Sequence, residues 1–540
     1  MKKTTVAIIL GLIVIFGLFL RFYHLGSQSY WMDEGYTINA VISAIHNGYS
    51  GGASILDSGG KYFCPLYCYP TQIIAQLNGQ NAVSYRLLAA LFGALFTILA
   101  FFITKIIFKN DQAALLTAFF VSFSYWQIAW SRQARWYTML EVFFWLAFLF
   151  FYLFLNFCHP ERRAKDLILS KNERPVFFRN NKYFYLALSI LFTVLAIITS
   201  DLAYILPLIM LVWYFFFNKT ACPAKLRRGA KLGGVSYLKI SIAAFIAIAV
   251  IAFAEYGLGL HFIAHALKNV SLHYTLPYYL NFYLRNYWLL IIIAIYGYFS
   301  ADKNKKRQLT MLALPFMIYL IFLSFFTQIV HYRYLFHTTL FIYMLAAAAI
   351  FNEKAACPTK LRHGAKLGGG FIPLLIIILF FLSGEGVIFP KNFYFLESDN
   401  PALFNRPYYG YTPQPDFNAA YAAIKKDLKP NDIVISSHPQ FTKIFLNQPG
   451  YWIKYNYLGM EDAPNTIINN REYYVGAEVI DSLDKLKQVL SEAEGGYIIF
   501  DYQSTDGRID PKIINYIQTN LPLFFYNKIN SYSQIWIYKF

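Results

Sequence analysis

Asp33 and Glu34 are adjacent carboxylates at a position where chemistry on a membrane-borne substrate can take place. They follow an uncharged apolar run, Thr4 to Leu20, that is long enough to cross most of a bilayer. A carboxylate just outside a membrane span is able to act as a general acid or base on a substrate carried in the lipid. The simpler interpretation is that both acids occupy the first turn of a helix, where the helix dipole favours negative charge.

Five basic side chains are expected at the same membrane face as these acids. Charged residues near a bilayer are costly and usually face a cavity or a partner. Carboxylates beside cations suit one reaction well, because a carboxylate can take the proton of an acceptor hydroxyl while cations hold a departing phosphate. The five residues are Lys61, Arg86, Arg132, Arg135 and Arg333.

Each cation also has a structural interpretation. Arg86 opens an apolar run and can simply extend its charge to the interface. Arg132 can be a surface charge, and Lys61 fits either interpretation equally well. Arg135 and Arg333 stand in connections that are too short to be solvated tails, which favours a functional role for both.

Aromatic residues accompany these charges. Trp31, Trp136, Tyr137 and Tyr334 can stack on a sugar or a prenyl chain, or they can anchor helix ends at the membrane interface. The chain contains no Asp-x-Asp pair, which argues against a metal-bound nucleotide-sugar donor. The expected placement outside the cytosol argues the same way, since nucleotide sugars are made inside.

Histidine and cysteine spacings give little support for a metal site. His261 and His265 have the i, i+4 spacing that a metal accepts, but an isolated pair favours a structural role. Five cysteines do not make a disulfide framework, although Cys64 and Cys68 share one predicted outer loop and can pair. We therefore assign no metal, while a divalent cation beside the acids stays an open alternative.

The composition identifies the elements that must position these residues. The chain is 57% hydrophobic and only 14% charged, and runs of about 20 apolar residues recur along it. This pattern predicts a polytopic α-helical membrane protein with about eleven spans. The expected spans are 4–21, 83–104, 112–130, 138–157, 183–200, 202–217, 239–256, 286–300, 309–327, 336–351 and 371–389.

The net charge of +18 follows this topology. With Lys2 and Lys3 inside, the N-terminus and the predicted inner loops hold 25 of the 47 Lys and Arg residues but only six Asp or Glu. That distribution is the positive-inside bias of membrane proteins and indicates no nucleic-acid partner. An odd number of spans places the C-terminus outside a cell membrane.

Two domains are expected. Residues 1–390 form the membrane domain, including a long outer loop at 22–82 that carries the acidic pair. Residues 391–540 are more polar and predict a small extracytoplasmic α/β domain. Its expected helices are 417–428 and 482–490, and its expected strands are 432–436, 496–500 and 534–538.

Two predicted inner loops repeat one segment. Residues 221–234 and 356–369 are identical at 12 of 14 positions, and the flanking spans do not repeat. We interpret both as insertions tolerated in loops that add positive charge, rather than as a binding site.

Four short motifs occur in a fixed order across residues 1–350. Together they resemble the motifs of GT-C membrane glycosyltransferases, in particular protein O-mannosyltransferases and lipid A aminoarabinose transferases. Cys64 stands where that family usually has a proline, which affects the shape of one turn. The motifs are Asp33-Glu34, Lys61 with Pro65-Leu66-Tyr67, the segment from Ser131 to Tyr137, and Arg333-Tyr334-Leu335.

This resemblance implies a polyprenyl-phosphate sugar donor and transfer to a hydroxyl of a protein, lipid or glycan, with inversion at the anomeric carbon. Asp33 would be the general base. Glu34 would orient the acceptor or Asp33, or help hold a metal. The residues implied at the donor phosphate are Lys61, Arg135 and Arg333, with Tyr67 and Tyr137 near it.

Two other classes of function remain as alternatives. A transporter or flippase of lipid-linked glycans would carry charges at mid-span on facing helices, whereas the charges here are expected at outer helix ends. A sensor or assembly protein would use its membrane part as an anchor, for which eleven spans are excessive. The enzyme is therefore the leading hypothesis.

Overall fold

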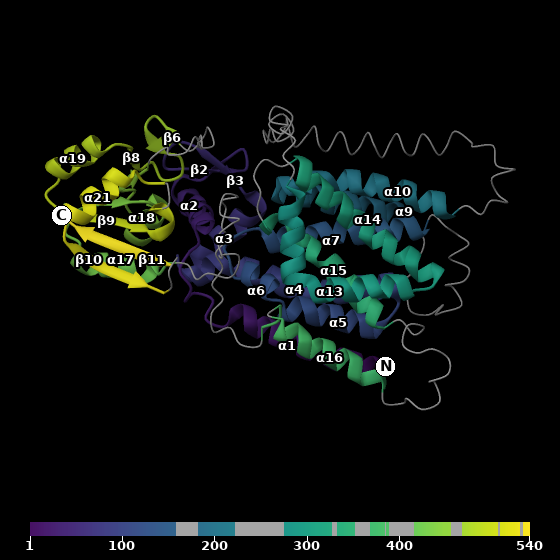
Figure 1. Ribbon diagram of the computed structural model, residues 1–540. Coiled ribbons are helices and arrows are strands. Elements are labelled where there is room, and N and C mark those ends of the chain that lie inside the picture. Colours follow the sequence, from purple (N-terminus) through teal and green to yellow (C-terminus); the bar gives the residue numbers. More distant parts are fainter. Residues whose placement is uncertain are drawn as a thin grey trace. The chain divides into compact units, whose positions relative to one another are not determined.

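The computed structural model describes residues 1–157, 182–221, 275–326, 332–351, 368–383, 385–387, 415–454, 467–505, 508–529 and 533–540 (Figure 1). The chain divides into two compact units, each discontinuous in sequence. The helical unit contains Met1–Arg21, Leu91–Ser131 and Trp136–Phe389. The mixed unit contains Phe22–Ala90, Arg132–Arg135 and Pro390–Phe540. The outer loop predicted at 22–82 thus belongs to the same unit as the C-terminal residues.

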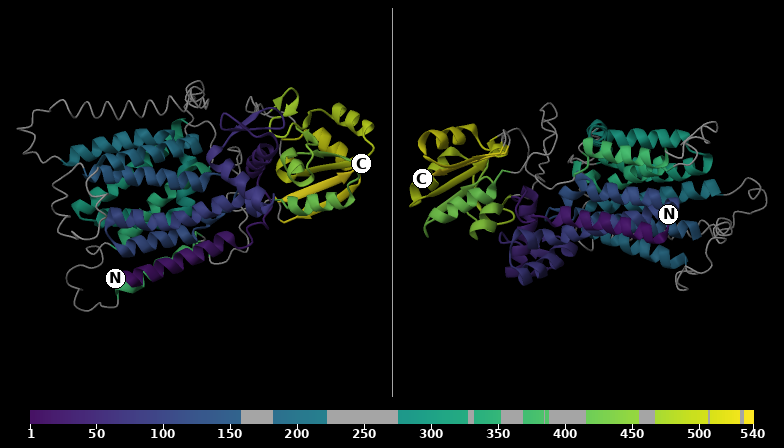
Figure 2. Two further views of the ribbon diagram at one scale, coloured as in Figure 1. Left: turned by 180° about the vertical axis from the view of Figure 1, so that it is seen from behind. Right: turned by 90° about the horizontal axis from the view of Figure 1, so that it is seen from below.

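Apolar helices running side by side build the helical unit, as both views in Figure 2 show. Six helices of the described residues are long and apolar enough to cross a membrane. The predicted class, a polytopic helical membrane protein, is confirmed. The helices and 3-10 turns are α1 (Lys3–Phe22), α4 (Ala82–Phe108), α5 (Asp111–Phe123), α6 (Tyr125–Ser131), α7 (Tyr137–Phe157), α9 (Lys182–Thr199), η2 (Asp201–Ile205), α10 (Leu206–Ala221), α13 (Leu276–Ser300), α14 (Lys303–Phe326), η5 (Tyr332–Thr338), α15 (Thr339–Ile350) and α16 (Gly368–Leu382).

Burial separates central from peripheral helices in this unit. Nearly every residue of α15 is buried, which is expected for a helix that is apolar on all sides. In contrast, α1 exposes apolar side chains such as Ile8 and Ile15 along one side. Exposed apolar residues on a spanning helix face lipid rather than water.

One expected span is interrupted. The run at 112–130 breaks at Ser124, whose backbone is extended and separates α5 from α6. A short segment pairs with this break, since Tyr125 donates its N–H to the Glu385 carbonyl and Val387 donates to that of Phe123. The expected span at 371–389 accordingly ends as a helix at Leu382. Apolar composition cannot reveal this break, because both sides of it are buried.

Other expected spans differ in length or cannot be compared. The run expected at 286–300 starts earlier, because α13 begins at Leu276 and is kinked at Tyr287. The run expected at 239–256 lies outside the described residues, so the count of eleven stays a prediction. The repeated loops and the His261–His265 pair also lie outside them.

The first part of the mixed unit is compact and partly helical. It contains α2 (Met32–Asn47), α3 (Pro65–Asn78) and a small antiparallel sheet in the order β1-β2-β3. The strands are β1 (Tyr49–Ser50), β2 (Ala53–Ile55) and β3 (Lys61–Phe63). Cys64 and Cys68, which the sequence allowed to pair, form a disulfide across the first turn of α3.

The C-terminal part of the mixed unit is an eight-stranded sheet in the order β10-β11-β9-β4-β5-β8-β7-β6. Its four central strands are parallel, and antiparallel strands flank them. The strands are β4 (Ile433–Ser436), β5 (Tyr451–Ile453), β6 (Ile467–Ile468), β7 (Arg471–Glu472), β8 (Glu478–Ile480), β9 (Gly496–Asp501), β10 (Leu523–Lys528) and β11 (Gln534–Lys539).

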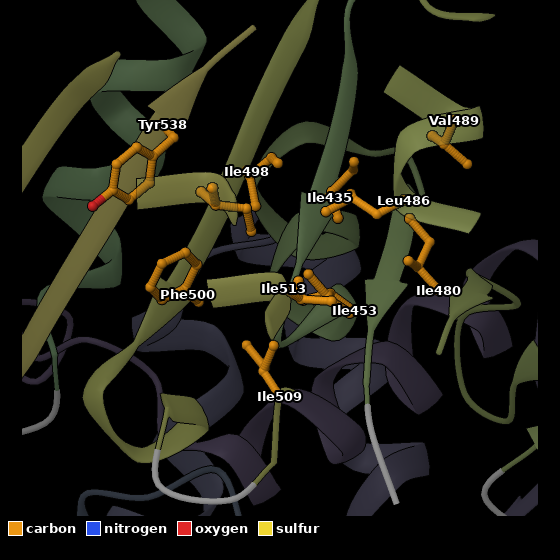
Figure 3. Close-up of a cluster of buried hydrophobic side chains, with 11 residues drawn as sticks. Ile435, Ile453, Ile480, Leu486, Val489, Ile498, Phe500, Ile509, Ile513 and Tyr538 are labelled. Atoms are coloured by element: carbon orange, nitrogen blue, oxygen red, sulfur yellow. The ribbon is translucent and has the colours of Figure 1, made fainter. Parts of the chain in front are cut away.

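Helices cover both faces of this sheet. On one face, α19 (Leu483–Glu492) and α21 (Pro511–Asn520) bury an aliphatic core over Ile435, Ile498 and Phe500 (Figure 3). On the other face lie α17 (Phe417–Asp427) and α18 (Pro439–Leu446), and a short α20 (Tyr502–Thr505) follows β9. The five elements expected in this region are confirmed within a few residues.

A tight turn between β7 and β8, residues 472–476, projects from this sheet and is called the tyrosine turn below. Glu472 is only 4% exposed, and its Oε2 accepts the N–H groups of Tyr474 at 2.9 Å and Val475 at 2.7 Å. Burial raises the pKa of Glu472 to about 7, although the two N–H groups act in the opposite direction. Between about pH 4.5 and pH 7 the folded state therefore keeps a proton on Glu472 that the unfolded chain releases.

Replacing Glu472 with glutamine should flatten the dependence of stability on pH. Stability of the wild type falls as pH rises from about 4.5 to about 7, because the unfolded carboxyl ionises there and the folded one does not. The pKa shift of Glu472 corresponds to a change of roughly 3 kcal/mol in the free energy of unfolding. Thermal unfolding of the detergent-solubilised protein at pH 5 and pH 8 measures this loss of stability. Equal pH dependence in wild type and Glu472→Gln would contradict this assignment.

Candidate active site

The acidic pair lies in the first turn of α2, as the structural interpretation of the sequence expected. Glu34 is completely buried, and its Oε2 accepts the N–H of Trp31 at 2.9 Å, which satisfies a backbone donor at the helix start. Asp33 is 7% exposed, so solvent reaches it and not Glu34. The two carboxylates therefore have different surroundings although they are adjacent.

Glu34 forms a buried ion pair with Arg86. The guanidinium donates Nε–H to Oε1 at 2.8 Å and Nη2–H to Oε2 at 2.9 Å, and both side chains have no exposed surface. The N–H of Ala134 also donates to Oε1, at 2.6 Å. Each oxygen of Glu34 thus accepts two hydrogen bonds, which leaves this carboxylate little capacity to accept a substrate proton.

Arg86 uses its remaining donors to fix the segment that leads into α2. Nη1 donates to two carbonyls of this segment and Nη2 to a third, at 2.9 to 3.2 Å, and the Tyr30 ring lies 5.1 Å from the guanidinium carbon. Arg86 is therefore fully buried among backbone carbonyls and Glu34, and its expected role at the substrate stays a prediction. The three carbonyls are those of Leu25, Gln28 and Ser29.

Asp33 is paired with Arg135. The carboxylate Oδ2 lies 3.6 Å from Arg135 Nη2, and Nη1 donates to the Asp33 carbonyl at 3.1 Å. The same Nη1 lies 2.9 Å from the hydroxyl of Thr37 and 2.9 Å from that of Tyr62. Arg135 thus links α2 to β3 and keeps a positive charge beside the Asp33 carboxylate.

Lys61 and Tyr67 lie on the elements that follow. Lys61 is an exposed residue at the start of β3. Tyr67 is buried in α3, and its hydroxyl donates to the Tyr85 carbonyl at 2.9 Å. Burial, with Glu34 nearby, raises the pKa of Tyr67 above its usual value. The expected role of Tyr67 near a phosphate stays a prediction.

Arg132 is buried and not the surface charge that one interpretation allowed. Its Nη1 donates to the carbonyl of Tyr23 at 2.8 Å and its Nη2 to that of His24 at 3.2 Å, just past the end of α1. Burial lowers its pKa to about 10, and the positive charge of Arg86 acts in the same direction. These contacts hold Arg132 against the end of α1, and its expected role at the substrate stays a prediction.

The remaining predicted residues belong to the helical unit, so their place at the acid site stays a prediction. Arg333 is buried in η5, with its guanidinium carbon 5.7 Å from the Tyr334 ring. Tyr319 donates its hydroxyl to the Tyr334 carbonyl at 3.1 Å. Tyr137 packs edge-on against Trp130 with 4.7 Å between ring centroids.

Several residues at the acid site were not identified from the sequence. Thr37 and Tyr62 share Arg135 with Asp33, and Tyr473 and Tyr474 contact β3 and α2. Thr37 follows Asp33 by four residues and could have been found from helical spacing. The tyrosines carry no local signal, because their contacts join residues that lie far apart in the sequence. No cluster able to hold a metal ion occurs among the residues that the structure describes.

Removing one partner of the Glu34–Arg86 pair should be strongly destabilising. Glu34→Gln leaves a buried guanidinium without a counter-charge, which typically costs about 3–5 kcal/mol. Asp111→Asn is a matched control, because its ion pair with Lys105 is exposed and contributes less than about 1 kcal/mol. Thermal unfolding in detergent compares the melting temperatures of Glu34→Gln and Asp111→Asn. The double replacement Glu34→Leu with Arg86→Met should recover part of the stability that Glu34→Gln loses. Equal melting temperatures for Glu34→Gln and Asp111→Asn would contradict the structural assignment.

Comparisons with known proteins support the expected resemblance. A family profile described as dolichyl-phosphate-mannose-protein mannosyltransferase matches residues 64–171. No curated protein sequence matches the chain.

Solved structures are similar over the whole chain. The apo crystal structure of ArnT from Cupriavidus metallidurans aligns with a TM-score of 0.58 at 14% identity, covering 98% of this chain and 97% of that one. The same protein bound to undecaprenyl phosphate aligns with a TM-score of 0.57 at 13% identity, covering 100% of this chain and 98% of that one. An apo oligosaccharyltransferase from Archaeoglobus fulgidus aligns with a TM-score of 0.52 at 12% identity, covering 93% of this chain and 70% of that one. The predicted resemblance is confirmed, and the chain has the fold of the ArnT-like membrane glycosyltransferases.

Proposed function

We propose that this membrane protein is a glycosyltransferase that moves a sugar from a polyprenyl-phosphate donor to an acceptor hydroxyl. The observation that carries the proposal is Asp33, a carboxylate that is 7% exposed and is fixed at a helix start beside Arg135. Support also comes from the structural relatives, which include ArnT bound to undecaprenyl phosphate and an archaeal oligosaccharyltransferase bound to a dolichol phosphate and an inhibitory peptide.

In the proposed reaction Asp33 acts as the general base. It takes the proton of the acceptor hydroxyl while the acceptor oxygen attacks the anomeric carbon. The bond between that carbon and the phosphate oxygen breaks, and the polyprenyl phosphate leaves with the bonding electrons. Attack from the face opposite the phosphate inverts the anomeric configuration. Lys61, Arg135 and Arg333 are proposed to stabilise the charge that develops on the phosphate.

The contacts of the two acids support this division of roles. Glu34 accepts four hydrogen bonds and is fully buried, so it is proposed to hold the helix start that carries Asp33. The ion pair of Asp33 with Arg135 is longer, at 3.6 Å, than the 2.8 Å contact of Glu34 with Arg86. Arg135 places a positive charge beside the Asp33 carboxylate. Protein, lipid and glycan hydroxyls and hexose or pentose sugars all fit this chemistry.

The enzyme is preferred to a transporter because of where charges lie in the mixed unit. Asp33, Lys61, Arg132 and Arg135 all lie outside the helices that are long enough to span a membrane. A transporter of lipid-linked glycans would instead place its charges at the middle of facing spans. No observation on the described residues favours the transporter specifically.

Asp33→Asn should abolish sugar transfer while leaving donor binding intact. The amide keeps the shape of the carboxyl but cannot accept the acceptor proton, so kcat should fall at least about a thousandfold for loss of a general base. Transfer from a radiolabelled polyprenyl-phosphate sugar in proteoliposomes measures the rate, and donor binding is measured separately on the same variant. Asp432→Asn is the matched control, since that residue lies far from α2 in the sequence and caps a turn. Wild-type rates in Asp33→Asn would remove Asp33 from the mechanism.

The proposal also requires the acid site to face away from the cytosol. A cysteine at Lys512, an exposed position in α21, should react with a membrane-impermeant maleimide in intact cells. Cys158, Cys222 and Cys357 are replaced by serine in this experiment, and a cysteine at Lys2 serves as the inner control. Labelling of the Lys512 position only after lysis would invert the topology.

A further inference from the structure

We propose that the C-terminal sheet sets the geometry of the acid site through Tyr473 and Tyr474, two positioning residues in the tyrosine turn. The inference rests on the proposed function for its catalytic meaning, whereas the contacts that carry it do not depend on that function. Neither tyrosine is expected to touch substrate. Both act through the elements that hold Lys61, Arg135 and Asp33.

Tyr473 binds the backbone of β3. Its hydroxyl accepts the N–H of Lys61 at 3.0 Å and donates to the Lys61 carbonyl at 2.5 Å. The Ser58 hydroxyl donates in return to the Tyr473 carbonyl. A single side chain from the C-terminal sheet therefore satisfies both backbone polar groups of Lys61 and fixes the start of the strand.

The chain at Gly60 allows this approach. A Cβ atom at position 60 would lie 2.8 Å from the Tyr473 ring, closer than side chains tolerate. Glycine at this position therefore lets the ring reach the strand. The fit between Gly60 and Tyr473 joins residues that are more than 400 positions apart in the sequence.

Tyr474 contacts both elements of the acid site. Its ring stacks on that of Tyr36 in α2, with 4.2 Å between centroids and 22° between planes. It also meets the Tyr62 ring of β3 edge-on at 5.7 Å. Aromatic pairs of this kind contribute about 0.5–1.5 kcal/mol beyond the area that they bury. Tyr36 follows Asp33 by three residues, so this stack holds the turn of α2 that carries the acid.

The Tyr62 hydroxyl transmits this constraint to Arg135. It lies 2.9 Å from Arg135 Nη1, and the same guanidinium pairs with Asp33. If Tyr62 moves, Arg135 loses one of its fixed partners and the positive charge beside Asp33 is free to shift. The path runs through direct contacts from Tyr474 to Tyr62, then to Arg135 and to Asp33.

Helix α18, which packs against the C-terminal sheet, contacts α2 and the loop before β3. Asn39 donates through its Nδ2 to the carbonyls of Gly35 at 2.8 Å and Gln440 at 2.9 Å. Lys443 pairs with Asp57 at 2.9 Å, between α18 and the loop before β3. These contacts hold the sheet against α2 when the tyrosine turn is altered, so substitutions of the tyrosines should shift the acid site without releasing the sheet.

Hydrogen exchange of the intact protein in detergent tests the positioning role of Tyr473 and Tyr474 without any transfer assay. Tyr474→Leu removes the two ring contacts, and Tyr473→Phe removes only the hydroxyl. Both should raise exchange at least about tenfold for amides of residues 49–63, and Tyr474→Leu should raise it for the first turn of α2. Tyr526→Leu replaces an exposed tyrosine of β10 and should change neither region. Unchanged exchange at 49–63 in both variants would overturn the proposal.

Transfer kinetics test the catalytic meaning. Tyr474→Leu should lower kcat at least about tenfold with little change in the KM for donor, and Tyr474→Phe, which keeps the ring, should restore it. In a Tyr62→Phe background the effect of Tyr474→Leu on kcat should be smaller than in the wild type, because the path through Tyr62 is already cut and only the stack on Tyr36 is left to lose. Full additivity of the two substitutions would overturn the proposed path. A wild-type chain that transfers no sugar would contradict the proposed function. The hydrogen-exchange result would still test whether Tyr473 and Tyr474 position β3 and α2.

Discussion

The buried ion pair between Glu34 and Arg86 is the interaction on which the acid site depends. Taking two charges out of water is costly, and the cost is offset here by bidentate geometry and by further hydrogen bonds from backbone N–H groups to Glu34 and from Arg86 to backbone carbonyls. The pair joins the start of α2, the start of α4 and the segment at 132–135. Asp33 is therefore presented on a rigid helix turn, although it lies in a long connection between apolar helices.

This arrangement gives two adjacent carboxylates different chemistry. Glu34 is saturated with donors and fixes the backbone, whereas Asp33 keeps contact with solvent and with Arg135. Basic residues follow the same division, because Arg86 and Arg132 bind carbonyls and Lys61 stays exposed. A charge at a membrane surface is thus not a functional residue by default, since its hydrogen-bond partners decide its role.

The sequence predicted the class of fold and most elements, because apolar runs and alternating patterns are local signals. It located the acidic pair at the start of a helix, and it allowed but did not predict the disulfide between Cys64 and Cys68. It could not place the break at Ser124, where a distant segment supplies the backbone partners. It also could not identify Tyr62, Tyr473 and Tyr474, whose contacts form only when residues from both ends of the chain meet. Local patterns carry no information on such pairings.

Chemical rescue tests the role of Asp33 most directly. Asp33→Ala leaves a space where the carboxylate was, and a small external carboxylate such as formate can enter it and accept the proton of the acceptor hydroxyl. Sugar transfer by this variant should be near zero without formate and should rise with formate concentration, while the wild type should not respond. Full activity of Asp33→Ala in the absence of formate would contradict the role of Asp33 as the base.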